Sequence, residues 1–345
     1  MRAAAALWSI EEVDEEDEVA ERIFLHETVM AAEVTEALAP VPGGTYVDVT
    51  LGGGGHAEAI LEAEPSARVI GLDRDPLALA AAAARLERFG ARFVSRKSTF
   101  SELGTVLLAL GIETVDGLVA DLGVSSPQID DPARGMSFRA AGPLDMRMDP
   151  TSGETVGEMI ARLSSDELAD VIFHYGDERR SRRIARCIKQ ADEAGELATT
   201  LDLRRAVVRA VGPARVGGVD PATRTFQALR IAVNGELSEI EALLVAAPFV
   251  VREGGILAMI SFHSLEDRLV KRATRERTIW EALTKKPLVP SDEECARNPR
   301  SRSAKLRTAR RLERESDEEG PRFIPSILPP SSGSRMRTRH GGRGE

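Results

Sequence analysis

The segment that most constrains this chain is the glycine-rich sequence VDVTLGGGGHAEAI at residues 47–60. Four consecutive glycines, residues 52–55, stand between an apolar strand pattern and a helix pattern that begins near His56. Glycine adopts positive φ and lets a ligand approach the backbone, and the first turn of a helix offers unbonded N–H groups. Asp73 follows Gly52 by 21 residues and ends the next strand pattern, where an acid is suited to bond ribose hydroxyl groups. The segment therefore predicts a nucleotide-binding turn at the edge of an α/β sheet.

Strand and helix patterns alternate along the first third of the chain, and one further strand pattern follows much later. The predicted strands are residues 45–50, 68–73, 92–95, 115–121 and 255–262, and the predicted helices among them are residues 56–63, 76–89 and 100–110. Alternation of this kind is typical of a largely parallel sheet that is covered by helices. The sequence therefore predicts a Rossmann-like, doubly wound α/β sheet.

The alternation stops after residue 121. Residues 122–153 are rich in Gly, Pro, Ser and Asp, and helix patterns without a strand pattern among them follow at residues 154–163, 165–174, 177–192 and 201–211. A long helix over residues 221–247 then leads back to the sheet, with Asp220 as its N-cap and Pro221 as its first residue. Its apolar face has spacings of three and four, at Phe226, Leu229, Val233, Leu237, Ile240 and Leu244.

These patterns divide the chain into two folded domains, in keeping with its length of 345 residues. The Rossmann-like domain takes residues 23–130 and 222–314, and an all-helical domain, residues 131–221, is inserted into it. An acidic extension, residues 1–22, and a basic tail, residues 315–345, are expected to be disordered.

The net charge of −9 by itself disfavours a nucleic-acid partner, because affinity for phosphate backbones comes from Lys and Arg. Most of this charge belongs to one run, residues 11–21, which contains eight acids and no base. Basic residues are clustered elsewhere, with eight in residues 295–314 against the single acid Glu313. The composition of the folded body is therefore compatible with a nucleic-acid partner, although a solvated basic face is an equally ordinary explanation.

The two cysteines, Cys187 and Cys295, lie far apart and form no CxxC pair, so the sequence predicts neither a disulfide framework nor a zinc site. The small number of cysteines and the lack of a pair favour a reducing, cytoplasmic location. No stretch approaches the roughly 20 apolar residues of a membrane span, and no spacing of His, Cys and Asp suggests another metal site.

Two cofactor classes fit the glycine turn. Gly52, Gly54 and Ala57 satisfy the dinucleotide fingerprint, so a nicotinamide- or flavin-dependent oxidoreductase is one hypothesis. Asp48 favours another, because a carboxylate four residues before the glycines repels a pyrophosphate and attracts an ammonium or sulfonium group. S-adenosylmethionine has both of these positive groups, and it has a ribose for Asp73.

The end of the fourth predicted strand carries compact hydrogen-bonding groups. Asp121 ends the strand, and Ser125, Ser126, Pro127 and Gln128 form a stiff turn at the edge where ligands bind in open α/β sheets. This turn is similar to the D/N/S-P-P-aromatic loop of methyltransferases that act on exocyclic amino groups, although no aromatic residue follows here. Acceptor groups in such a loop align the amine lone pair with the methyl group, so we predict Asp121 and residues 125–127 as the catalytic set.

Several blocks of sequence, in the same order, resemble one family, the bacterial RsmH or MraW family of ribosomal RNA (cytosine-N4)-methyltransferases. They extend from about His26 to about Glu313 and read VDVTLGGGGH, GLDRDP, DLGVSSPQ, GPLDMRMDP, DPATRTFQALRIAVN, SFHSLEDRLVK and NPRSRSAKLR. The resemblance implies a class I methyltransferase fold with an inserted helical domain. It also implies methyl transfer from S-adenosylmethionine to N4 of a decoding-region cytidine in the 16S ribosomal RNA of the small subunit.

The resemblance further implies which residues contact the cofactor: Gly54, Gly55, His56, Asp73, Phe100, Asp121 and Gln128. Candidate contacts with the RNA are charged or polar residues outside the glycine turn: Arg147, Arg179, Arg183, Arg224, His263 and Arg302. His263 is at least as well placed to cap a helix, and Arg147 is equally suited to a surface ion pair. A non-catalytic RNA-binding assembly factor is the remaining alternative. No membrane or metal is expected to take part.

Overall fold

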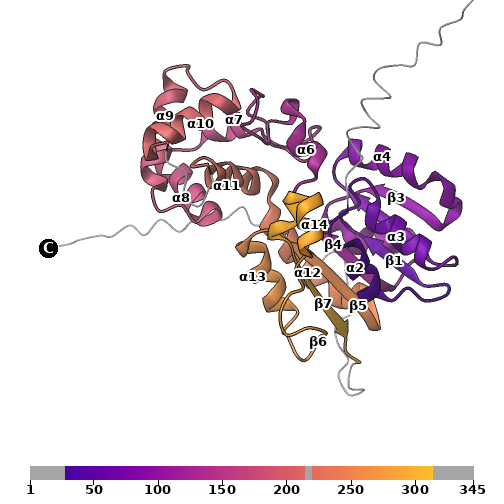
Figure 1. The fold of residues 1–345 in the computed structure, drawn as a ribbon. Helices are drawn as coiled ribbons and strands as arrows, with labels where there is room; N and C mark the ends of the chain where they lie inside the picture. Colours follow the sequence, from indigo (N-terminus) through magenta and orange to yellow (C-terminus); the bar gives the residue numbers. More distant parts are fainter. Residues whose placement is uncertain (1–27, 214–219, 314–345) are drawn as a thin grey trace, which may run out of the picture.

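The structure, a computed structural model, describes residues 28–213 and 220–313 (Figure 1). The acidic extension and the basic tail that the sequence predicts lie outside these residues. Figure 1 shows two bodies, a sheet flanked by helices and a separate group of helices next to it.

One seven-stranded sheet forms the first body, with the strand order β3-β2-β1-β4-β5-β7-β6. Its strands are β1 (Thr45–Asp48), β2 (Arg68–Asp73), β3 (Phe93–Lys97), β4 (Val115–Asp121), β5 (Val251–Ser261), β6 (Trp280–Ala282) and β7 (Lys305–Arg311). Strands β1 to β5 run parallel, whereas β7 is antiparallel to both β5 and β6. The predicted parallel sheet is confirmed, and β2 and β4 have the predicted bounds.

The sequence did not predict β6 and β7. β7 occupies part of the basic segment 295–314, which we expected to be an exposed basic surface. In the sheet, Arg307 and Arg311 are buried, and the Arg307 guanidinium lies 2.8 Å from the carboxylate of Asp267. Arg311 donates a hydrogen bond to the carbonyl of Pro248. These two arginines therefore stabilise the sheet, which leaves a smaller part of the basic segment for a partner.

Two apolar cores cover the two faces of the sheet. Helices α2 (Ala31–Leu38), α3 (Gly55–Ala63) and α4 (Pro76–Leu86) pack on one face, and α5 (Leu103–Ala109), α12 (Glu236–Val250) and α13 (Ser264–Ala273) pack on the other. Successive residues of β4 alternate between the two cores, as Leu118 and Val119 do. Because β1, β2 and β4 are in parallel register, their carboxyl ends bring Asp48, Asp73 and Asp121 to one edge.

The second body consists of helices, as the sequence predicts. They are α7 (Val156–Arg162), α8 (Ser165–Gly176), α9 (Ser181–Glu193), α10 (Thr200–Val211) and α11 (Thr223–Asn234). Their apolar faces form a third core around Ile160, Leu168, Ile184 and Leu203. Shorter elements complete the described chain: α6 (Ser126–Asp130), α14 (Asp292–Arg297), and the 3-10 helices η1 (Glu87–Arg92), η2 (Phe100–Glu102), η3 (Pro132–Arg134) and η4 (Pro299–Ser303).

The single helix predicted over residues 221–247 is wrong. The segment forms two helices, α11 and α12, which are separated at Gly235 with φ of 60°. The apolar stripe is divided between them, because Phe226 packs in the core of the helical body and Ile240 packs in the core of the sheet. Glycine at a positive φ is a common helix terminator, so this residue allows one stripe to serve two cores. We therefore place the boundary between the two bodies at Gly235 instead of residues 221 and 222.

The predicted N-cap at Asp220 is also wrong, because the N-cap residue of α11 is Ala222. The Asp220 carboxylate instead accepts a hydrogen bond from the backbone N–H of Ala222 and pairs with Arg204 at 2.8 Å. Asp220 therefore fastens the start of α11 to α10. Among the described residues, no helix has the length and apolar character needed to cross a membrane.

Candidate functional site

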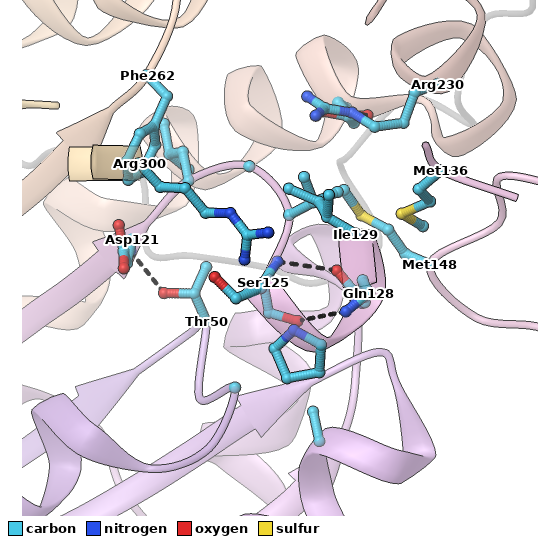
Figure 2. Close-up of a pocket in the computed structure, with 18 of the residues that line it drawn as sticks. Thr50, Asp121, Ser125, Gln128, Ile129, Met136, Met148, Arg230, Phe262 and Arg300 are labelled. Carbon is cyan, nitrogen blue, oxygen red and sulfur yellow. Dashed lines mark hydrogen bonds and ion pairs between the residues drawn. The ribbon is translucent and has the colours of Figure 1, made fainter. Parts of the chain in front are cut away.

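A cavity of about 620 Å³ opens between the carboxyl edge of the sheet and the helical body. Its lining comes from the loops that follow β1, β2 and β4 and from α6 on one side, and from α11 on the other. Figure 2 shows Asp121, Ser125 and Gln128 at this edge of the sheet and Arg230 across from them. All but one of the predicted cofactor residues line the cavity: Gly55, His56, Asp73, Phe100, Asp121 and Gln128.

The exception is Gly54, which packs against α4 instead of lining the cavity. It is the N-cap of α3, its φ is 82°, and a Cβ atom there would lie 2.9 Å from a methyl carbon of Leu86. A Cβ atom on Gly55 would lie 1.7 Å from the hydroxyl oxygen of Thr28. Glycine is therefore required at both positions, at Gly54 by backbone conformation and packing and at Gly55 by the close approach of Thr28.

Two carboxylates, one buried and one half-buried, lie below this turn. Asp48 is 0% exposed and accepts a hydrogen bond from the backbone N–H of Thr50 at 3.0 Å. Asp73 accepts hydrogen bonds from the backbone N–H groups of Gly52 at 2.8 Å and Asp75 at 2.9 Å. Burial raises the pKa of Asp48 and the pKa of Asp73 to about 6, because the charged form loses its hydration. A positively charged ligand at this edge would therefore be attracted to acids that the fold has already desolvated.

The predicted catalytic turn is the start of α6. Ser125 is the N-cap of this helix, and its backbone N–H donates to the Gln128 side-chain oxygen at 3.0 Å. The Gln128 amide nitrogen donates to the carboxylate of Asp75 at 2.8 Å. Both ends of the Gln128 side chain thus hold the turn in place, and Ser125 (Figure 2), Ser126 and Pro127 line the cavity.

Asp75 also ties the sheet to the loop that leads into the helical body. Its carboxylate lies 2.8 Å from the guanidinium of Arg134, and both side chains are buried. The other end of that guanidinium donates to the carbonyl oxygen of Met148 at 2.7 Å, and the backbone N–H of Met148 donates to the side chain of Asn234 at 2.7 Å. This chain of bonds connects the start of α4, the loop and α11, and so it links the two sides of the cavity. No sequence pattern indicated this role of Arg134.

The predicted RNA residues of the helical body lie outside the cavity. Arg179 and Arg183 are exposed, and within the described chain neither takes part in an ion pair. Arg224 is exposed and donates to the carbonyl oxygen of Asp177 at 3.2 Å, which fastens α11 to the end of α8. The exposed pair Arg179 and Arg183 is therefore the better candidate for contact with a polyanion.

The remaining predicted RNA residues differ in their surroundings. Arg147 pairs with Asp145 at 2.8 Å, so its charge is already matched within the loop. Arg302 is exposed in η4, and its neighbour Arg300 lines the cavity and pairs with Asp130 of α6. His263 lines the cavity and is the N-cap of α13, as the capping alternative predicts.

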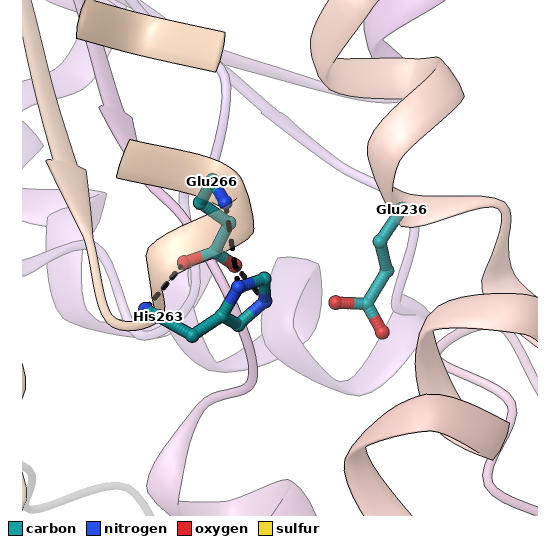
Figure 3. A group of neighbouring side chains, drawn as sticks. All are labelled: Glu236, His263 and Glu266. Atoms are coloured by element: carbon teal, nitrogen blue, oxygen red, sulfur yellow. Dashed lines mark hydrogen bonds and ion pairs between the residues drawn. The ribbon is translucent and has the colours of Figure 1, made fainter. Parts of the chain in front are cut away.

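His263 also belongs to a group that the sequence did not reveal. Ligand atoms of Glu236, His263 and Glu266 all lie within 4.8 Å of one another (Figure 3), which is the composition of a metal site. His263 Nδ1, however, accepts the backbone N–H of Glu266 at 3.3 Å, so a neutral imidazole must carry its hydrogen on Nε2. His263 Nε2 lies 3.1 Å from Glu266 Oε1, and Glu236 accepts two hydrogen bonds from Arg230 at 2.8 and 2.9 Å. The group is therefore an ion-pair cluster, because a metal at Nε2 would have to break the helix cap.

The glycine turn, the acids and the polar turn of α6 form one site, to which comparisons with known proteins add an identity. The profile of the MraW methylase family matches residues 23–312. The chain is 67% identical to the Ribosomal RNA small subunit methyltransferase H of Sorangium cellulosum (strain So ce56) over 287 residues, 83% of this chain and 91% of that protein. It is 50% identical to the protein of the same name from Cyanothece sp. (strain PCC 7425 / ATCC 29141), over 84% of this chain and 96% of that protein.

A solved structure of an rRNA methylase from Streptococcus thermophilus aligns with 9% identity and a TM-score of 0.38, over 82% of this chain and 94% of that chain. This likeness is too low to carry an argument about the site. The family match and the sequence relatives are the informative comparisons.

Proposed function

Because the chain belongs to the MraW methylase family and uses S-adenosylmethionine, we propose that it methylates N4 of a cytidine in the decoding region of 16S ribosomal RNA. The names of its relatives support the coarser part of this proposal, a methyltransferase of small-subunit ribosomal RNA. One observation carries the finer part: the cavity brings Asp73, Asp121 and a compact acceptor turn to a single edge, next to a body with exposed arginines. Family membership also removes the nicotinamide-dependent alternative.

The residues at the edge of the sheet fit the cofactor. Asp121 lines the cavity, so its carboxylate can face a cationic ligand, and the buried carboxylate of Asp48 behind it adds negative charge. Asp73 retains lone pairs for ribose hydroxyl groups next to the glycine turn. When bound, the cofactor supplies an electrophilic methyl group.

The acceptor turn fits an exocyclic amine. Asp121, Ser125 and Ser126 offer oxygen atoms to the amine hydrogens, and this directs the nitrogen lone pair towards the methyl group. A base must leave its stack to reach this depth, and the rings of Phe138 and Phe262 line the cavity where they can contact it. Arg179, Arg183 and Arg302 would then hold the surrounding phosphates, and no metal takes part in this proposal.

The test uses small ribosomal subunits from a bacterial host that lacks this activity. After incubation with the full chain and S-adenosylmethionine, mass spectrometry of RNA fragments locates and identifies every new methyl group. We expect N4-methylcytidine at one cytidine of the decoding region. Methylation of another atom, of free DNA or of protein contradicts the proposal, and tight RNA binding without turnover supports the assembly-factor alternative instead.

A further inference from the structure

Three ionisable side chains meet under the glycine turn, where β1 and β4 end and α3 begins. They are Asp48, which is 0% exposed, His56, which is 4% exposed, and Asp121, which lines the cavity. His56 Nε2 lies 3.7 Å from Asp121 Oδ2, an ion-pair distance that is too long for a hydrogen bond. The imidazole therefore lies in the field of a carboxylate without being fixed to it by a hydrogen bond.

The cluster has an unusual number of polar atoms without hydrogen-bond partners. Among the described residues, His56 Nδ1 and Nε2, Asp48 Oδ2 and Asp121 Oδ1 are all buried and unpartnered. A buried polar group that lacks a partner costs about 1–3 kcal/mol, so such a cluster is a poor device for stability alone. Its value must lie in the charges that it places beside the cavity.

The surrounding charges favour a positive imidazole. Burial lowers the pKa of His56, but the carboxylates of Asp121 and Asp48 more than offset this effect, and the pKa is raised above its ordinary value. Glu294 of α14 adds to the rise from a further element, and Asp73 of β2 adds negative charge beside Asp48. Acids on β1, β2, β4 and α14 thus surround one histidine.

We propose that His56 is a positioning residue, a cation held between Asp48 and Asp121 that orients Asp121 so that its carboxylate accepts the proton released by the methylated amine. This inference rests on the proposed function. In the transfer, the N4 lone pair forms the new N–C bond, and the C–S bond breaks with its electrons left on sulfur. The cationic N4 then loses one proton to the Asp121 carboxylate, and the N–H electron pair returns to nitrogen. The proton passes to solvent when the products leave.

Other polar groups of the cavity are less suited to accept this proton. His263 Nδ1 already accepts a backbone N–H, and its Nε2 carries hydrogen. The Gln128 side chain is bonded at both ends, and Asp73 accepts two backbone N–H groups at the position of the ribose. The Asp121 carboxylate combines a negative charge with a place in the cavity lining, and its side chain is 24% exposed.

The first test observes His56 in the cofactor-free full chain. The chain has five histidines, so NMR spectra of protein with labelled histidine are simple, and the His56→Gln variant assigns the signal of interest. We expect the imidazole to titrate with a midpoint above roughly 6.5, and Asp48→Asn to lower that midpoint by about one pH unit. The inference is overturned if the imidazole is neutral throughout pH 6–8, or if Asp48→Asn leaves the midpoint unchanged.

The second test measures single-turnover methylation of small subunits against pH. Gln has a hydrogen-bond donor but no charge, so we expect His56→Gln to lower the rate about tenfold to a hundredfold. We also expect the acid limb of the profile to move up by about one pH unit, while the Kd for S-adenosylmethionine changes less than threefold. His174→Gln, on the exposed side of α8, is the matched control and should leave the rate, the pH profile and the Kd unchanged.

The outcomes separate the two proposals. A His56→Gln variant with weaker cofactor binding and an unshifted pH profile would show that His56 is a cofactor ligand only, and would overturn the inference alone. Wild-type protein that methylates no cytidine N4 would refute the proposed function, whereas the NMR titration would still report the charge of His56. His56→Asn repeats the test if the Gln variant does not fold.

Discussion

The two bodies of this molecule differ in how well their buried polar groups are satisfied. Among the described residues, nearly all buried side-chain atoms without a partner belong to the sheet domain or to its first loops, as at Asp48, His56 and Asp121. The helical body contributes only Thr225 Oγ1 to this set. Buried polar groups normally have hydrogen-bond partners. A region where several of them lack partners is less stable for it, and such regions are often functional sites.

The helical body is built differently. Its helices α7, α8 and α10 begin with complete capping boxes at Thr155, Ser164 and Thr199, and its core is apolar. Its charges lie on the outside, where Arg179 and Arg183 are exposed. The difference indicates that the sheet domain holds the reacting groups and that the helical body offers a surface to the substrate.

The largest effect is expected at the sheet edge. Asp73→Ala removes the acceptor for the ribose hydroxyl groups, and we expect the Kd for S-adenosylmethionine to rise about a thousandfold, since hydrogen bonds to a charged group contribute roughly 1.5–3 kcal/mol each. Isothermal calorimetry measures this. Asp116→Ala is the control, because Asp116 lies at the opposite edge of the same sheet, where it bonds Thr45 and Arg252. Unchanged affinity in Asp73→Ala would refute the cofactor assignment.

The next effect concerns the joint between the two bodies. Arg134→Met leaves Asp75 as a buried carboxylate without its guanidinium partner, so we expect a loss of about 3 kcal/mol in the free energy of unfolding. Urea denaturation measures the loss. Arg162, at the end of α7, forms an exposed ion pair with Glu154. Arg162→Met breaks this pair and should lower the free energy of unfolding by less than about 1 kcal/mol. Equal losses in the two variants would show that the Arg134 bridge does not join the bodies.

A smaller effect follows from the acids with raised pKa. In the free protein the pKa of Asp48 and the pKa of Asp73 are about 6, so both bind protons below that pH. A cationic ligand favours their ionised forms, and binding should therefore release protons and tighten about fivefold to tenfold as the pH rises from 5 to 7. Calorimetry in buffers of different ionisation enthalpy detects the release. Asp48→Asn should flatten the dependence, and a wild-type Kd that is constant over this range would contradict it.

The smallest effect is expected on the helical body. Replacing Arg179 and Arg183 together by Gln should weaken binding to small subunits about threefold to tenfold and reduce the slope of log K against log salt by about one per lost phosphate contact. The Kd for S-adenosylmethionine should not change, because neither residue lines the cavity. Arg162→Gln, on the same body, is the control. An unaltered salt slope would show that the RNA lies elsewhere.

Local patterns were sufficient for much of the sheet domain. The strands β2 and β4, the glycine turn and the polar turn of α6 all depend on short-range signals, namely apolar runs, glycines at positive φ and a capping residue. β7 was missed because its arginines resemble a solvated face in sequence. Only the fold supplies Asp267 as the partner that allows Arg307 to be buried.

The sequence by itself determined the class of fold, the glycine turn and the predicted cofactor residues, most of which line the cavity, because each depends on a motif within a few tens of residues. Tertiary structure alone decided how Gly235 divides one apolar stripe between two cores, and how Arg134 joins Asp75 to the loop before the helical body. It also decided that Asp48, His56 and Asp121 meet. Burial and charge pairing between distant segments depend on distances in space, which spacing along the chain does not contain.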